Sequence, residues 1–151
     1  DLIPPTTSRV AQQTDEEINA RIRRQTENNV AYFGKDGSQA IGERLRELDR
    51  EWDVERLLEA NAATIALTGL CLGSLVNRRW FALPAIVAGF LLQHAIQGWC
   101  PPIPVFRRLG MRTQSEIEQE RYALKAMRGD FKTIQGNGDD RTGAVMEAVR
   151  A

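Results

Sequence analysis

Two side chains with chemical potential lie close together in the sequence: the only histidine, His94, and the thiol of Cys100. His94 stands between Gln93 and Gln97, and an imidazole in such a place could be an axial ligand of a haem or chlorophyll. The alternative is a polar side chain near the end of a helix that hydrogen-bonds to its neighbours. We expect the second role, because no other histidine is present to complete a ligand set.

Cys100 could carry sulfur or bind haem at a membrane surface, but no general base that would lower its pKa lies near it in the sequence. The prolines that follow favour a structural role, because proline redirects a chain that leaves a helix and resists regular helix itself. We therefore expect a non-helical interface turn made by Cys100, Pro101, Pro102 and Pro104.

The remaining composition excludes several classes of function. The sequence has no phosphate-binding loop of the GxxxxGK type, no CxxC and no HExxH, and one histidine within an apolar stretch cannot support a soluble Ser-His-Asp triad. Twenty basic and twenty acidic residues balance, so no basic surplus favours nucleic acid. We expect a protein that is not an enzyme and that uses no metal and no cofactor.

The elements that hold His94 and Cys100 are two uncharged stretches, residues 60–77 and 80–106, separated by Arg78 and Arg79. Charged residues make up 26% of the chain, so two adjacent charge-free stretches are significant. A helix needs about 20 mostly apolar residues to cross a bilayer. The sequence therefore predicts a transmembrane hairpin with spans of about 58–76 and 80–99. Two core helices of a soluble bundle are disfavoured, because 151 residues leave little protein to surround them.

Small residues recur at helical spacing in both spans. Such faces let helix backbones approach closely in lipid, where packing replaces the hydrophobic effect. We expect them to close the hairpin on itself, while self-association through the same faces stays open. The predicted packing residues are Ala62, Ala66, Gly69 and Gly73 in the first span and Ala85 and Gly89 in the second.

The distribution of arginines predicts the orientation of the hairpin. Seven arginines flank its outer ends, and only Arg78 and Arg79 lie in its turn. By the positive-inside rule both termini are then cytoplasmic, which we expect at a bacterial inner membrane. Trp80 and Trp99 bracket the second span, as indoles do at the level of the headgroups.

Amphipathic cytoplasmic helices are predicted on both sides of the hairpin. After an extended lead-in to residue 13, Thr14 and Glu17 form a capping box for a helix that Gly34 ends. A second capping box, Thr113 and Glu116, begins a helix that runs to about Arg128. Residues 136–140 read as a flexible linker.

Between these helices and the first span, one helix has an apolar stripe suited to docking. This docking stripe consists of Ile41, Leu45, Leu48 and Trp52. It could bind a partner helix or lie on a membrane, and packing on the first helix of the same chain is an equally good interpretation. The predicted organisation is all-α, with a cytoplasmic helical extension over residues 1–53, the hairpin over 54–106 and a cytoplasmic helix and tail over 107–151.

The end of the second span carries a family resemblance. Gly98, Cys100 and Pro101, followed by Leu109 and Gly110, are similar to the Gly-x-Cys-Pro and Leu-Gly pattern of a small bacterial inner-membrane family of unknown function. It is the two-helix module found fused behind rhodanese domains (the YgaP type), and the likeness covers roughly residues 55–110. It implies a membrane location and a hairpin fold. Sulfurtransferase activity does not carry over, because the rhodanese domain is missing.

Taken together, the sequence predicts a non-catalytic accessory or scaffolding subunit of a larger membrane complex, of respiratory or photosynthetic type. Its expected partners are the lipid bilayer and other subunits of that complex. The alternative is a small homo-oligomeric transport or sulfur-handling module with Cys100 or His94 in its path. Two helices alone cannot enclose a pathway, so this alternative requires self-association.

Overall fold

The computed structural model describes residues 3–132, 134 and 139–150, and within them every regular element is a helix. The predicted all-α class is therefore confirmed. The chain divides into two units, residues 1–23 with 52–115 and residues 24–51 with 116–151, which are treated separately below. The elements are α1 (Arg9–Gln12), α2 (Glu16–Lys35), α3 (Ser38–Leu48), α4 (Val54–Leu75), the short 3₁₀ helix η1 (Arg78–Phe81), α5 (Ala82–Gln97), α6 (Ile103–Arg108), α7 (Gln114–Arg128) and α8 (Asp139–Arg150).

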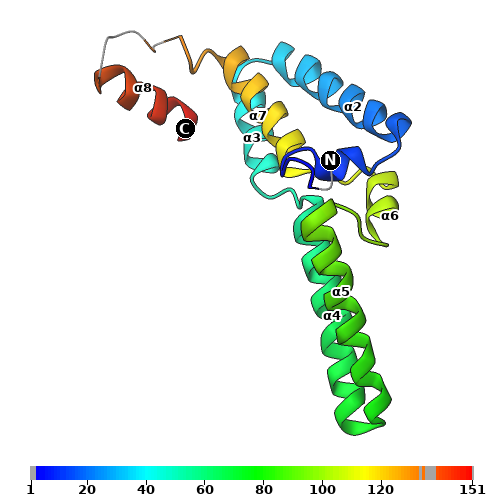
Figure 1. Cartoon of the computed structure of the whole chain (residues 1–151). Coiled ribbons are helices and arrows are strands. Elements are labelled where there is room, and N and C mark those ends of the chain that lie inside the picture. Colours follow the sequence, from blue (N-terminus) through cyan, green and yellow to red (C-terminus); the bar gives the residue numbers. More distant parts are fainter. Residues whose placement is uncertain (1–2, 133, 135–138, 151) are drawn as a thin grey trace. The chain divides into compact units, whose positions relative to one another are not determined.

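Two helices of the first unit are long and apolar enough to cross a membrane, α4 and the continuous segment of η1 and α5. Asp53 caps α4 by accepting a hydrogen bond from the backbone N–H of Arg56 at 2.9 Å. Asn77 caps η1 in the same way, through the N–H of Arg79. Gly98 then ends α5 with a φ of 79°, a backbone conformation that favours glycine. Figure 1 shows that α4 and α5 run side by side along their whole length.

The N-terminal segment is more ordered than the predicted extended lead-in. The carbonyl of Pro5 accepts hydrogen bonds from the N–H groups of Ser8 and Arg9, and α1 follows directly. The predicted capping role of Thr14 is also wrong, because its hydroxyl donates to the carbonyl of Val10 at 2.7 Å. The hydroxyl thus closes the end of α1, and α2 begins two residues later.

The prediction that the segment Pro101–Pro104 forms no regular helix is wrong in part. Pro101 and Pro102 form a turn, but α6 begins at Ile103 and includes Pro104 in its first turn. Proline is tolerated there because the first N–H groups of a helix have no partner within the helix. Only the preceding turn redirects the chain.

The core of the first unit lies where α1 and α6 meet the start of α4 and the end of α5. Its buried residues come from three helices, α1, α4 and α6, and from the turn after α5, and Leu91, Phe106 and Met111 pack against them. The backbone N–H of Val54 also donates to the carbonyl of Arg112 at 2.8 Å, which joins the start of α4 to the segment before α7. The buried set is Val10, Val54, Leu58, Cys100 and Ile103.

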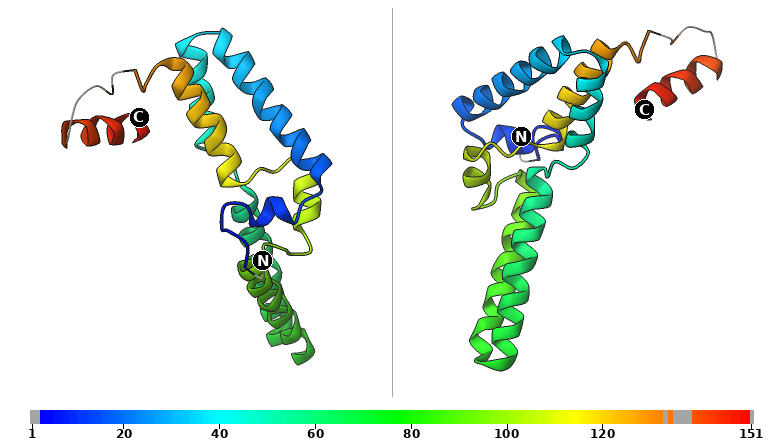
Figure 2. Two further views of the ribbon diagram at one scale, coloured as in Figure 1. Left: turned by 45° about the horizontal axis from the view of Figure 1, so that its top comes forward. Right: turned by 180° about the vertical axis from the view of Figure 1, so that it is seen from behind.

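The second unit is a cluster of α3 with parts of α2 and α7. Figure 2 shows α3 and α7 side by side in both views, with the end of α2 next to them. The apolar face of α3 packs against Ile117 and Leu124 of α7, and Val30 and Phe33 of α2 border this core. Gly34 does not end α2, as the sequence suggested, because the helix continues to Lys35. A Cβ on residue 34 would meet the thioether end of Met127, a flexible and exposed side chain that can move aside, so packing does not require glycine there.

A buried carboxylate joins the three helices of this second unit. Glu120 is fully buried and accepts hydrogen bonds from Arg44 of α3 at 2.7 Å and from Asn29 of α2 at 3.2 Å. Burial opposes the charge of Arg44, but its contacts with Glu120 and Glu47 outweigh that effect and raise the pKa of the guanidinium. A buried charge that is paired in this way fixes the register of the helices, because any shift would leave it uncompensated.

At the C-terminal end, the predicted linker and the structure overlap only in part. Residues 136–138 lie outside the described residues, whereas Asp139 and Asp140 begin α8 instead of belonging to a linker. The predicted helical stretch near residues 144–149 is part of this longer helix.

Candidate functional site

The small face predicted for the first span packs directly on the second apolar helix. Gly69 and Gly73 are buried. A Cβ added to Gly69 would meet the ring of Pro84 at 2.7 Å, and one added to Gly73 would meet the ring of Phe81 at 2.7 Å. Both distances are too short for carbon atoms, so glycine is required for this close approach. Ala62 is also buried and Ala66 half-buried, which extends the same face toward the start of α4.

The small face predicted for the second span is not at this interface. Ala85 and Gly89 are exposed, and a Cβ on Gly89 would meet nothing within 4 Å. The face of α5 toward α4 instead carries larger residues, Pro84, Val87 and Leu91, which recur at steps of three and four. Close approach needs a small face on only one of the two helices. The larger side chains of α5 fill the space that the glycines of α4 leave open.

His94 lies at the end of this interface and pairs with a carboxylate that a third helix also contacts. The residue is 5% exposed, and its Nε2 lies 2.6 Å from Oε2 of Glu55 on α4. The second carboxylate oxygen of Glu55 accepts a hydrogen bond from the guanidinium of Arg9 on α1 at 3.0 Å. Glu55 thus connects the N-terminal helix, the start of α4 and the end of α5.

This arrangement limits the chemistry open to His94. Its Nε2 is engaged by the carboxylate, so a metal or proton acceptor could reach the ring only through Nδ1. Nδ1 is buried and has no hydrogen-bond partner among the described residues. A carboxylate that orients an imidazole resembles the outer partner of a metal-bound or catalytic histidine. In this protein the same contact joins α1 and α5 to α4.

Cys100 is part of the core of the first unit. It is 4% exposed, and burial raises the pKa of its thiol, which disfavours the reactive thiolate. Its carbonyl accepts a hydrogen bond from the N–H of Ile103 at 3.0 Å, which closes the Pro101–Pro102 turn. Cys71 is exposed on α4, and both cysteines are free thiols.

The docking stripe is divided between two environments. Ile41, Leu45 and Leu48 are buried in the core of the second unit, where α7 and α2 cover them. Trp52 lies beyond the end of α3 and is 45% exposed, with the guanidinium of Arg56 4.4 Å from its ring centre. The stripe is therefore an internal packing surface, because its apolar residues already have partners within this chain.

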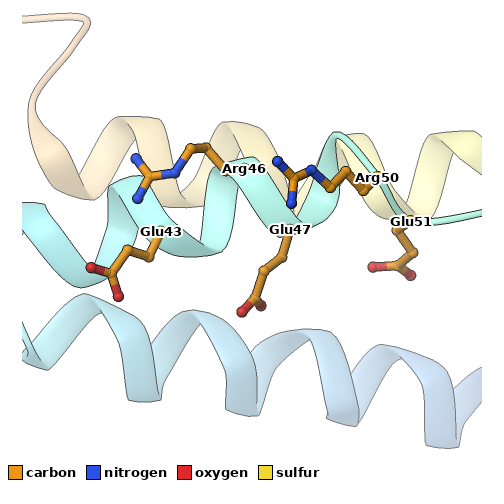
Figure 3. A pocket seen from close by; sticks show the side chains of 5 residues that line it. All are labelled: Glu43, Arg46, Glu47, Arg50 and Glu51. Atoms are coloured by element: carbon orange, nitrogen blue, oxygen red, sulfur yellow. The ribbon is translucent and has the colours of Figure 1, made fainter.

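The outer side of α3 forms an open polar groove of about 590 Å³. Figure 3 shows that Glu43 and Glu47 point to one side of the helix, while Arg46 and Arg50 point to the other. The groove is therefore lined by groups of both signs, as is typical of a solvated helix surface.

No metal site is formed by the part of the chain that the structure describes, since no three His, Cys, Asp or Glu side chains gather there. No protein-family model, no curated protein and no solved structure matches this chain. The resemblance of the Gly98 to Gly110 segment to the two-helix family therefore stays a prediction.

Sequence reasoning missed Glu55 as the partner of His94 and Arg9 as the second partner of Glu55. A signal for Glu55 was present, because it precedes the first uncharged stretch and His94 stands near the end of the second. A hairpin brings the start of one helix beside the end of the other, and a carboxylate and an imidazole on facing sides would then meet. Arg9 gave no such signal, since it lies in a short helix that sequence patterns did not predict.

The glycine face gives a prediction with a matched control on the neighbouring helix. Gly69→Ala and Gly73→Ala should each lower the thermal midpoint in detergent, because overpacking a tight contact costs about 1–3 kcal/mol. Gly89→Ala should leave the midpoint unchanged or raise it, since alanine is a better helix former by about 1 kcal/mol and the added methyl meets nothing. Equal effects of all three substitutions would contradict this packing.

The junction at Glu55 gives a second prediction. Glu55→Gln should weaken the contacts with both His94 and Arg9 and so loosen α1, at a cost of about 1–3 kcal/mol for unsatisfied buried partners. Backbone amides of α1 should then exchange hydrogen faster, as followed by mass spectrometry. Glu59→Gln, an exposed position one turn along α4, is the control and should change nothing. Unaltered exchange in both variants would show that Glu55 does not hold α1.

Proposed function

We propose that the α4–α5 pair spans a membrane as a hairpin and that the protein is a non-catalytic accessory or scaffolding subunit of a membrane complex. The observation that carries this proposal is the exposure of the two apolar helices. Only 22% of the most apolar window of α4 and 6% of that of η1 and α5 is buried. Core helices of a soluble protein would be mostly covered, so these surfaces require an apolar environment.

The dimensions of the pair suit this role. With 22 and 20 residues, the two candidate spans measure about 33 and 30 Å at a rise of about 1.5 Å per residue. The hydrocarbon core of a bilayer is about 30 Å thick. Outward-facing side chains along both helices are large and apolar, among them Leu67, Leu70, Ile86 and Leu92.

Polar groups on the outer face of α4 are satisfied within the helix itself. The hydroxyls of Thr64, Thr68 and Ser74 each donate to the carbonyl four residues earlier, at 2.7 to 2.9 Å. In hydrocarbon no water is present to accept these hydrogen bonds, so such internal bonding lets a hydroxyl face lipid. The exposed face therefore carries hydroxyl groups without a need for solvent.

The orientation of the proposed hairpin rests on its charges. The arginine excess at the open end supports cytoplasmic termini, with the turn at Asn77 to Arg79 on the opposite side. A bacterial inner membrane is the setting that the resemblance to the two-helix family implies.

The accessory role is supported by how the candidate chemical groups are used. His94 is paired with Glu55, and Cys100 is buried with a raised pKa, so both contribute to packing. Outside the apolar pair, the second unit provides a separate helical cluster that could contact other subunits. The alternative, a homo-oligomeric transport or sulfur-handling module, would have to assemble its path from several copies.

The mass of the protein in mild detergent separates these two functions. An accessory subunit should co-purify with other chains in a defined complex, and the Cys100→Ser variant should do so equally well. A uniform homo-oligomer without other chains would contradict the accessory role. Loss of the host cell's relevant activity on Cys100→Ser at a normal protein level would favour sulfur handling instead.

The topology can be tested with single cysteines in a Cys71→Ser, Cys100→Ser background. A membrane-impermeant maleimide applied to whole cells should label Asn77→Cys in the turn. It should label Lys132→Cys only after the cells are permeabilised, because that residue is proposed to be cytoplasmic. Labelling of residue 132 but not residue 77 in intact cells would reverse the orientation, and labelling of both would exclude a hairpin.

A further inference from the structure

A narrow apolar groove lies along the α4–α5 pair. Its volume is about 210 Å³, and its walls come from α4, from α5 and from the turn that follows α5. Three of its lining side chains, Ile65, Ile86 and Phe90, are also exposed on the outer surface of the pair. The groove therefore opens onto the surface that we propose to face lipid.

The groove is elongated in the direction of the helices. It extends from Leu58, which lies with Pro101 and Pro102 at one end, to Leu83, which contacts Gly69. From residue 58 to residue 69 a helix rises about 16 Å. A second helix of that length and about 10 Å in diameter would occupy about 1,200 Å³, several times the volume of the groove. The space suits a single flexible chain and excludes an inserted helix.

One polar side chain, Asn61, lines this otherwise apolar groove. Thr64 and Thr68, on the same helix, satisfy their hydroxyls internally. The amide of Asn61 contributes almost nothing to the accessible lining, which is nearly all carbon, so the groove suits an apolar ligand.

The end of the groove at Pro101 and Pro102 has features of a membrane interface. Phe90, in the groove wall, packs edge to face on Trp99 with ring centres 6.4 Å apart. Indoles prefer the level of the lipid headgroups, where one side of the ring is wet and the other apolar. A molecule that enters at this end and extends along α4 would lie as lipid chains do, along the bilayer normal.

We propose that the groove binds one acyl chain of a membrane phospholipid. This inference rests on the proposed insertion of the α4–α5 pair in a bilayer. The lipid fills a gap between the two helices that their own side chains leave open.

Photo-crosslinking of the full chain tests this binding. The protein is reconstituted in phosphatidylethanolamine vesicles that contain a phosphatidylethanolamine with a diazirine in one acyl chain, and labelled positions are mapped by mass spectrometry. Labelling should be enriched at Ile86 and Phe90 over the outer positions Leu92 and Ile96. The enrichment reflects a chain that stays in the groove while the lipids around the outer positions exchange freely.

One variant and its control give the inference its specificity. Ile65→Trp should remove the enrichment by filling the groove, while Leu67→Trp, on the exposed side of the same helix, should preserve it.

The possible outcomes separate the two proposals. Equal labelling of groove and outer positions would overturn lipid binding and leave the membrane insertion intact. Absence of labelling at every position would overturn the insertion itself and the lipid site with it. A disulfide between two chains that carry Ile86→Cys in a Cys71→Ser, Cys100→Ser background, formed in the vesicles under oxidation, would show instead that a second copy covers the groove.

Discussion

The structure depends on one constraint, the close contact of α4 with α5 at two glycines. Gly69 and Gly73 bring the helix backbones so near that a single methyl group at either position would collide with Pro84 or Phe81. This contact fixes the register of the pair. The register in turn sets Glu55 beside His94 at the other end and leaves room for the groove around Asn61. A looser helix pair would align neither feature.

Burial is distributed unevenly between the two units. The second unit buries its apolar residues against one another and pairs the charge of Glu120 with Arg44, as a water-soluble cluster does. In the first unit the apolar side chains of α4 and α5 remain on the surface over most of their length. Glu55 and Arg9, with the core around Leu58 and Cys100, lie at the end of this pair where polar and apolar environments meet.

Much of the fold could be predicted from the sequence, because it follows from local patterns. The absence of charge over two stretches gave the two long apolar helices, and the apolar spacing of Ile41, Leu45 and Leu48 gave the face of α3. Whether that face binds a partner or its own chain depends on tertiary packing, which spacing alone does not encode. The same limit explains Ala85 and Gly89, which are small like Gly69 and yet face outward.

The candidate site was harder to predict, because its contacts join distant parts of the chain. His94 and Cys100 stood out as residue types, but their roles depend on Glu55, Arg9 and the core around Leu58. The start of α6 shows a different limit of sequence reasoning. The closely spaced prolines suggested that no helix could form there, but proline is tolerated in the first turn of a helix, where Pro104 lies. The groove at Asn61 needed the positions of side chains from three segments.

The central claim is that the outer surface of the α4–α5 pair faces lipid, and spin labels on single cysteines at Leu67 and Leu92 test it most directly. In vesicles, both labels should collide frequently with oxygen, which concentrates in hydrocarbon, and rarely with a water-soluble nickel complex. A label at Lys132, outside the apolar pair, should show the reverse preference. Ready access of the nickel complex to residues 67 and 92 in protein bound to vesicles would contradict the account.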